Sequence, residues 1–147
     1  MSVVIRQAGI EEIFRLRLRL LRPTVPVEMH HFPGDADAPP QTYHFGAFVE
    51  AVNVGCASLM LNIWQGTPAY QLRGMAVEEA YRSHGIGSQL LTLVDQTVLT
   101  QTPIRTLWCN ARVPAIRFYE RNGWQVMSEV FNIEEVGPHK KMMKPLL

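Results

Sequence analysis

Between residues 75 and 90 the chain reads Met75-Ala-Val-Glu-Glu-Ala-Tyr-Arg-Ser-His-Gly-Ile-Gly-Ser-Gln-Leu90, the end of an apolar strand followed by a short loop and the start of a helix. We predict that the helix runs from Gly85 to Val98, because its apolar residues recur every four positions. Backbone N–H groups converge in such a loop, and the helix N-terminus adds partial positive charge. Gly85 and Gly87 let a ligand approach the main chain, and Arg82 supplies a cation. The stretch therefore predicts a site for a phosphate or pyrophosphate.

Two common phosphate-binding loops do not fit this stretch. The dinucleotide-binding pattern G-x-G-x-x-G needs a glycine at position 90, where this chain has Leu90. The P-loop needs a lysine directly after its last glycine, and the first lysine of this chain is Lys140. From these residues alone, a glycine-rich helix start that binds nothing is an equal alternative.

The patterns on either side of this loop predict a succession of strands and helices. Strands are predicted at 3–7, 44–50, 52–64, 69–77, 105–109, 124–136 and 139–144, and helices at 10–21, 85–98 and 114–122. Residues 15–20 also alternate like a strand, but the apolar stripe of 10–21 and the acidic Glu11 and Glu12 favour a helix. Strand–helix–strand connections require a parallel pair, whereas hairpins are antiparallel. We expect the α/β (α+β) class, with a mixed, mostly antiparallel sheet of about seven strands flanked by about four helices.

The segment from Pro23 to Gln41 interrupts this succession. It holds half of the ten prolines of the chain, and proline removes a backbone donor and breaks helices. Loops of this length inside a domain are usually functional or disordered. We therefore predict a loop or lid here.

Length and composition limit the kind of protein. The 147 residues suit a single domain spanning 1–147, and 47% hydrophobic residues with a net charge of +1 exclude a disordered chain. The near-zero charge argues against nucleic acid as the main partner. No apolar run approaches the ~20 residues that span a bilayer, and no signal peptide is present, so we expect a cytoplasmic protein without a membrane partner. We expect Cys56 and Cys109 to be buried, reduced thiols.

Two motifs in order resemble one enzyme family. The first is Arg82-Ser-His-Gly85-Ile-Gly87 after a strand that ends in Ala76-Val77, which resembles the coenzyme A signature of the GNAT superfamily of N-acetyltransferases. The second is Ala115-Ile-Arg-Phe-Tyr-Glu-Arg-Asn-Gly-Trp124, which matches the family pattern A-x-x-F-Y-x-x-x-G-[FW]. The separation of the two motifs along the chain is also typical of the family. The resemblance covers residues 69–126 firmly.

The resemblance implies a cosubstrate, acetyl-CoA, and no metal. Its pyrophosphate would rest on Arg82–Ser88, and its pantetheine arm would lie between two splayed parallel strands, 69–77 and 105–109, in the manner of strand addition. Gly74 is the expected bulge that causes the splay. The residues so assigned to coenzyme A are Met75, Ala76, Val77, Arg82, Ser83, His84, Gly85, Ile86, Gly87, Ser88, Asn110, Arg112, Ala115, Phe118 and Tyr119.

The chain departs from the family at one pantetheine contact. Many relatives have an asparagine three residues before the alanine of the second motif, and this chain has Arg112 there. Asn110 is the candidate to take over that contact, and Arg112 could equally reach a phosphate.

The implied chemistry is acyl transfer to an amine. Tyr119 matches the family tyrosine near the sulfur and is expected to be the acid that protonates the leaving thiolate, the alternative being that it only packs or binds the thioester. A backbone N–H at Met75 or its neighbour is expected to stabilise the carbonyl oxygen. The strand 69–77 lacks the carboxylate that serves many relatives as base, so the candidates are His139, His84, Glu28 or a water chain.

The acceptor is expected to be a small-molecule or peptide amine. Arg73 is a candidate to orient an acidic group of that substrate. Arg19 is another, since Arg15, Arg19 and Arg22 share a helical face beside the acceptor cleft, although such a face is commonly only solvated. The missing strand carboxylate keeps a second function open, that of a non-catalytic acyl-CoA-binding sensor or interaction module.

Two further expectations concern metal and assembly. His30, His31 and His44 do not have the spacing of metal ligands, so no metal is expected. A C-terminal edge strand carrying Met142 and Met143 would favour pairing with a second chain and hence a homodimer.

Overall fold

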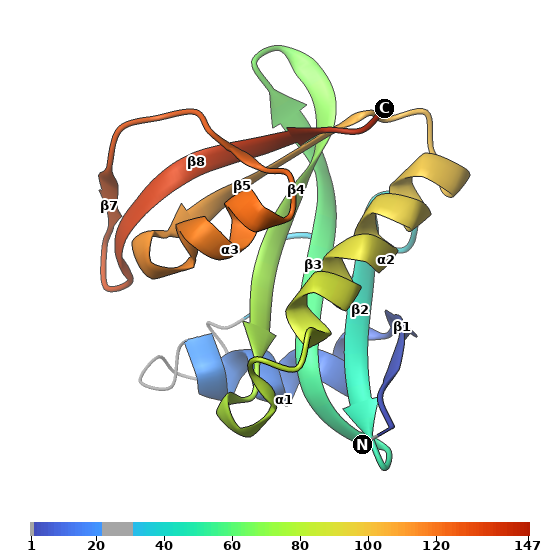
Figure 1. Ribbon diagram of the computed structural model, residues 1–147. Coiled ribbons are helices and arrows are strands. Elements are labelled where there is room, and N and C mark those ends of the chain that lie inside the picture. Colours follow the sequence, from blue (N-terminus) through green and yellow to red (C-terminus); the bar gives the residue numbers. More distant parts are fainter. Residues whose placement is uncertain (1, 22–30) are drawn as a thin grey trace.

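The computed structural model describes residues 2–21 and 31–147 (Figure 1). Its α-helices and strands are β1 (Val4–Ala8), α1 (Ile10–Leu21), β2 (Thr42–Val49), β3 (Val52–Trp64), β4 (Thr67–Val77), α2 (Ile86–Gln101), β5 (Thr106–Arg112), α3 (Ile116–Arg121), β6 (Gln125–Val126), β7 (Phe131–Ile133) and β8 (Gly137–Pro145). Two single-turn 3-10 helices lie before α2 and α3, at Glu79–Tyr81 and Val113–Ala115. The helix predicted from Pro114 therefore begins as a 3-10 turn and becomes α-helical only at Ile116.

The strands form one mixed sheet in the order β1-β2-β3-β4-β5-β8-β6, with β7 also paired to β8. Within it β4 and β5 run parallel, and the other pairs are antiparallel. This confirms the predicted fold class, with eight strands instead of about seven. The described residues contain three α-helices.

The extra strand arises where one long strand was predicted at 124–136. Trp124 is instead the end of the α3 turn, since its N–H donates to the carbonyl of Tyr119 at 3.1 Å. The backbone then pairs with β8 in two pieces, β6 and β7. Between them the Ser128 hydroxyl accepts the N–H of Lys141 at 2.8 Å, so a side chain replaces the strand ladder.

The expected C-terminal edge strand is wrong. β8 lies inside the sheet, between β5 on one side and β6 and β7 on the other. Met142 pairs with Cys109 on β5 and with Val126 on β6, and its side chain is fully buried. Since both edges of β8 are occupied within the chain, it offers no free edge to a second copy.

Helices cover the two faces of the sheet unequally. Figure 1 shows α2 and α3 in front of the sheet and α1 behind it. Leu90, Leu91 and Val94 of α2 belong to the main core, whereas Ile13 and Leu16 of α1 form a second cluster with Cys56 of β3. The region of β5 and β8 behind α3 therefore has no helix on its other face among the described residues.

The helix predicted at 10–21 is confirmed. Glu12 explains its start, because its carboxylate accepts the N–H of Gly9 at 2.9 Å and caps the first turn. Ile13, Leu16 and Arg17 form the buried face, and α1 packs against β2, β3 and β4. An arginine therefore lies on the face that packs against the sheet.

Part of the proline-rich segment is described. Residues 31–41 form successive tight turns, in which Asp35 N–H donates to Phe32 O and Asp37 N–H to Gly34 O, each at 3.0 Å. Tyr70 fixes the far end by donating its hydroxyl to Pro40 O at 2.7 Å. Residues 23–30 of the predicted lid, with Arg22 and the base candidate Glu28, lie outside the described residues. None of the helices in 2–21 and 31–147 is long and apolar enough to cross a lipid bilayer.

Candidate active site

A gap opens between the two parallel strands of the sheet. β4 pairs with β5 only at Tyr70–Leu72, opposite Leu107–Cys109. β4 stays paired with β3 as far as Val77, so beyond Leu72 its other edge faces no strand of the described chain. In Figure 1 the two strands separate beyond this contact.

A bulge at Gly74 accompanies the separation. Cys56 pairs with Ala76 but Ser58 pairs with Arg73, so β4 carries one residue more than β3 in this interval. Gly74 has φ +62°, a left-handed conformation that glycine adopts without steric cost. The predicted bulge is confirmed, and the extra residue bends β4 away from β5.

Two cavities meet at this gap. The first, which we name the loop cavity, has a volume of about 690 Å³ and lies between the 82–88 loop and α3. The second, the hairpin cavity, has a volume of about 170 Å³ and lies beside the β7–β8 hairpin. Both are lined by Leu21, Met75, Arg112, Ala115 and Tyr119. The two cavities therefore adjoin at the gap between β4 and β5, and we call the pair of them the channel.

Most residues assigned to coenzyme A from sequence line the loop cavity: Met75, Ala76, Val77, Arg82, Ser83, Gly85, Ile86, Gly87, Ser88, Arg112, Ala115, Phe118 and Tyr119. Asn110 lies in the hairpin cavity instead, where its carboxamide oxygen accepts a hydrogen bond from Lys141 Nζ at 3.2 Å. His84 is exposed and does not line either cavity.

The start of α2 presents unused backbone donors to the loop cavity. Gly85 is the N-cap with φ 77°, and the first helical hydrogen bond runs from Gln89 N–H to Gly85 O at 3.0 Å. The N–H groups of Ile86, Gly87 and Ser88 precede that bond and have no partner within the helix. Arg82 Nε donates to Val77 O at 3.0 Å and holds the loop against the end of β4. The site can therefore bind an anion mainly through main-chain donors and the helix dipole.

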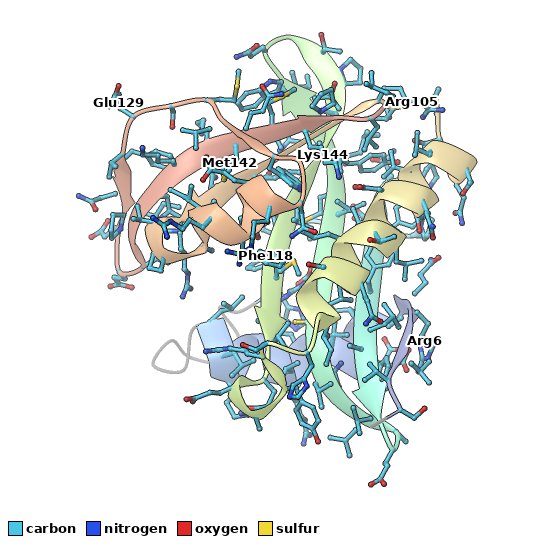
Figure 2. All side chains as sticks on the ribbon, viewed as in Figure 1. Arg6, Arg105, Phe118, Glu129, Met142 and Lys144 are labelled. Atoms are coloured by element: carbon cyan, nitrogen blue, oxygen red, sulfur yellow. The ribbon has the colours of Figure 1, made fainter. Side chains whose placement is uncertain are left out.

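Gly87 has a packing role that the sequence did not reveal. A Cβ atom at this position would lie 2.9 Å from Cζ of Phe118, so the Phe118 ring, or α3 with it, would have to shift. Phe118 can be followed in Figure 2, where it projects from α3 toward the start of α2. The glycine thus sets how closely α3 approaches the anion-binding loop.

Replacing Gly87 by Val is therefore expected to push α3 away from the loop. We expect the free energy of unfolding to fall by about 1–3 kcal/mol, as in other overpacked cores. Coenzyme A affinity, measured by calorimetry, is expected to fall with it. Thr92→Val is the matched control, since it places the same side chain on the exposed face of α2. Equal affinities for the two variants would contradict the packing role.

Tyr119 stands where the two cavities meet. Its side chain is 7% exposed and lies between the rings of Phe118 and Trp124 at centroid distances of 5.3 and 5.4 Å. Burial raises the pKa of its phenol well above the usual value, and the neighbouring Cys109 acts in the same direction. The hydroxyl therefore stays protonated at neutral pH and can donate a proton or a hydrogen bond from its own O–H.

His139 faces Arg112 across the β5–β8 pair and lines the hairpin cavity. Its ring is 3% exposed, and Nδ1 lies 2.7 Å from the carbonyl oxygen of Gly137. A carbonyl only accepts, so Nδ1 carries the proton and Nε2 is the accepting nitrogen of the neutral ring. The arrangement gives His139 the tautomer that a base needs.

The two arginines predicted for the substrate have different surroundings. Arg73 lines the hairpin cavity, and its guanidinium lies 4.1 Å from the ring centroid of Phe32. Arg19 lies in neither cavity and forms a two-point ion pair with Glu78. This pair holds the pKa of the Glu78 carboxyl below its usual range. Of these two arginines, the structure therefore brings only Arg73 to the channel.

Sequence reasoning missed several residues of the hairpin cavity. Phe32 enters it from the 31–41 turns, Gln71 from β4, and Ile133 and Val136 from β7 and the turn after it. Gln71 is oriented by Asn62, whose amide donates to its carboxamide oxygen at 3.0 Å. No motif marks these positions, because they come together only through loop geometry and strand register.

Both cysteines and His44 are buried in the structure. Cys56 and Cys109 are free and buried, as expected, and burial raises the pKa of each thiol to about 12. His44 bonds to Ser58 and to the carbonyl of Asp35. No group of three or more metal-ligating side chains is found in 2–21 and 31–147.

Comparison with known proteins agrees with this geometry. A family model described as an acetyltransferase (GNAT) domain matches residues 40–126. The uncharacterized N-acetyltransferase YitI of Bacillus subtilis (strain 168) is 30% identical over 146 residues, covering 97% of this chain and 95% of the relative.

Solved structures share the fold over nearly the whole chain. An acyl-CoA N-acyltransferase from Pseudomonas aeruginosa superposes with a TM-score of 0.78 at 16% identity, covering 97% of this chain and 99% of that one. An aminoglycoside 6'-N-acetyltransferase complexed with coenzyme A gives a TM-score of 0.72 at 17% identity, covering 98% and 97%. On the family match and the identity to YitI, the chain belongs to the GNAT acetyltransferase family.

Proposed function

We propose that the protein transfers an acetyl group from acetyl-CoA to a primary amine, in one step within a ternary complex. The observation that carries this proposal is the pair of adjoining cavities between β4 and β5, with Tyr119 and Met75 among the residues that line both. A thioester arm entering from the loop cavity and an amine entering from the hairpin cavity would meet there. A structural neighbour that was solved with coenzyme A supports the type of cosubstrate.

The loop cavity has the donors that the cosubstrate requires. The N–H groups at the start of α2 and the Arg82 side chain would bind the pyrophosphate. The free edge of β4 at Met75 and Val77 would pair with the amides of the pantetheine arm, as a peptide strand adds to a sheet edge. Arg112, on the opposite strand, would face the arm from the other side of the loop cavity, and Asn110 would lie beyond it in the hairpin cavity.

The amine must lose a proton before it attacks. An alkylammonium has a pKa of ~10, so about one molecule in a thousand is neutral at pH 7. His139 would accept this proton at Nε2, directly or through water, because Nδ1 is held by Gly137 O. The new C–N bond then forms as the C–S bond breaks.

Two groups that line both cavities would stabilise the charges of the reaction. The N–H of Met75 would donate to the carbonyl oxygen as it becomes negative. The Tyr119 hydroxyl would give its proton to the departing thiolate, and the second proton that the acylated nitrogen loses would restore it, directly or through water. Arg73 would bind an acidic group of the acceptor from the far end of the hairpin cavity.

The only cysteine lining the channel in the described chain is a poor acyl carrier. Cys109 lines the hairpin cavity, but burial raises the pKa of its thiol to about 12. The thiolate is the nucleophilic form of cysteine, and it is scarcely populated at neutral pH. This supports direct transfer over a covalent acyl-enzyme.

Thiol release from acetyl-CoA across a panel of amines tests the function. The panel should include amino acids, peptide N-termini, aminoglycosides and simple amines. We expect at least one class of amine to increase the rate of thiol release from acetyl-CoA. Thermal unfolding with millimolar acetyl-CoA or CoA is the companion measurement, and both ligands are expected to raise Tm. A raised Tm without release on any amine would favour the acyl-CoA sensor, and an unchanged Tm would reject both functions.

A further inference from the structure

A buried polar network connects α1 to the wall of the hairpin cavity. Arg17 is 2% exposed, and its Nη1 and Nη2 donate to Asp35 Oδ2 and Ser58 Oγ, each at 2.7 Å. Ser58 in turn donates to Nδ1 of His44 at 2.6 Å, and Nε2–H of His44 donates to Asp35 O at 2.9 Å. Burial lowers the pKa of His44, which keeps its ring neutral in this arrangement. These hydrogen bonds position the Arg17 guanidinium through its two Nη atoms, whereas its Nε is buried without a hydrogen-bond partner in the described part of the chain.

Phe32 is fixed by the same network. Its N–H donates to Asp35 Oδ2 at 2.8 Å, and its ring lies 4.1 Å from the guanidinium carbon of Arg17. The guanidinium carbon of Arg73 lies at the same distance from the ring centroid. Both guanidinium groups therefore contact the Phe32 ring. The order of contacts is Asp35, Arg17, Phe32, Arg73, and the last two of these line the hairpin cavity.

The bulge of β4 is part of the same packing. A Cβ atom at Gly74 would lie 2.8 Å from Arg17 Nε and 3.1 Å from Phe32 Cε2. The absence of a side chain at Gly74 therefore leaves the space that Arg17 and Phe32 fill. Arg73 directly precedes Gly74 in β4. The backbone of Arg73 therefore adjoins this packing, and its side chain contacts Phe32.

We propose that Arg17 and Phe32 are positioning residues, which hold the Arg73 guanidinium where it binds an anionic or other hydrogen-bond-accepting group of the amine acceptor. This inference rests on the proposed function. It adds two residues, Arg17 and Phe32, that act on acceptor binding through Arg73. It also names the class of acceptor, an amine that carries a carboxylate or a comparable group. Cation–π contacts strengthen when they are desolvated, as at this buried ring.

The test is steady-state kinetics on the acceptor that the panel identifies. Phe32→Leu keeps an apolar side chain but removes the ring, and Phe32→Tyr restores the ring. We expect Phe32→Leu to raise KM for the acceptor about tenfold, equivalent to about 1.4 kcal/mol. In Phe32→Leu, KM for acetyl-CoA is expected to stay within about twofold of wild type. Phe32→Tyr is expected to have the wild-type KM for the acceptor.

A double variant shows whether Phe32 acts through Arg73. Arg73→Met is expected to raise the acceptor KM, and adding Phe32→Leu to it is expected to change nothing further, because coupled residues are not additive. Phe48→Leu is the matched control, since Phe48 has a similar contact with Arg6, at 4.2 Å, away from the channel.

Each outcome decides the proposal. Additive effects of the two substitutions, an unchanged acceptor KM in Phe32→Leu, or an equal rise in Phe48→Leu would overturn it while leaving the proposed function intact. A wild-type protein that binds CoA but acetylates no amine would instead remove the proposed function, and this inference with it.

Discussion

Tyr119→Phe is expected to lower kcat about a hundredfold or more, the usual contribution of a positioned general acid. Phenylalanine keeps the ring contacts with Phe118 and Trp124 and removes only the hydroxyl. KM for acetyl-CoA is therefore expected to change little. The measurement is initial-rate thiol release with both substrates varied.

Tyr43→Phe is the matched control for this substitution. Tyr43 is buried in the same core but lines neither cavity, so its loss of a hydroxyl is expected to leave kcat unchanged. An unchanged kcat in Tyr119→Phe would reject the acid role and leave Tyr119 as a packing residue.

The pH dependence of the wild type offers a second check on Tyr119. An acid works only while it is protonated, and burial raises the pKa of this phenol above its ordinary value of about 10. The contribution of Tyr119 should therefore persist as pH rises to 10 and be lost only above it. A fall in kcat centred near pH 8 that disappears in Tyr119→Phe would contradict this assignment.

Arg17→Met is expected to lower the free energy of unfolding by about 3–5 kcal/mol, the usual cost of removing one partner of a buried ion pair. Asp35 is 5% exposed and accepts from both Arg17 and the N–H of Phe32 through one oxygen. Without Arg17 the carboxylate stays buried, with the Phe32 N–H as hydrogen-bond donor to that oxygen and His31 Nδ1 at 3.6 Å from it. Urea unfolding at neutral pH measures the loss.

Arg19→Met, two residues further along α1, is the control. Its ion pair with Glu78 has an arginine that is 59% exposed, and exposed pairs contribute at most about 1 kcal/mol. Adding Asp35→Asn to Arg17→Met is expected to recover part of the loss, because it removes the buried charge. Similar losses for Arg17→Met and Arg19→Met would show that burial does not set the strength of these pairs.

Much of the anion site could be predicted from sequence, since it is built from main chain. Glycine at 85 and 87 and the apolar repeat of α2 are local signals, and the backbone donors follow once the helix start is placed. The bulge at Gly74 was also predictable, because a glycine inside a strand has few other uses.

The acceptor side could not be predicted in the same way. Arg17 looked like one member of an alternating run of arginines, and only the packing of α1 on the sheet shows that it is buried. The placement of β8 between β5 and β6 depends on long-range pairing, so its residues look like an edge strand when the sequence is read in order. Phe32 and Gln71 belong to the cavity through tertiary contacts alone.

Gly74 has a consequence for how the two substrates influence each other. The same residue forms the bulge that opens the channel for one of them and contacts the Arg17–Phe32 stack at the end used by the other. A ligand that shifts this residue on binding changes the affinity at the opposite end. Thermodynamic linkage then requires the effect to be mutual, so that each substrate alters the dissociation constant of the other by one shared factor.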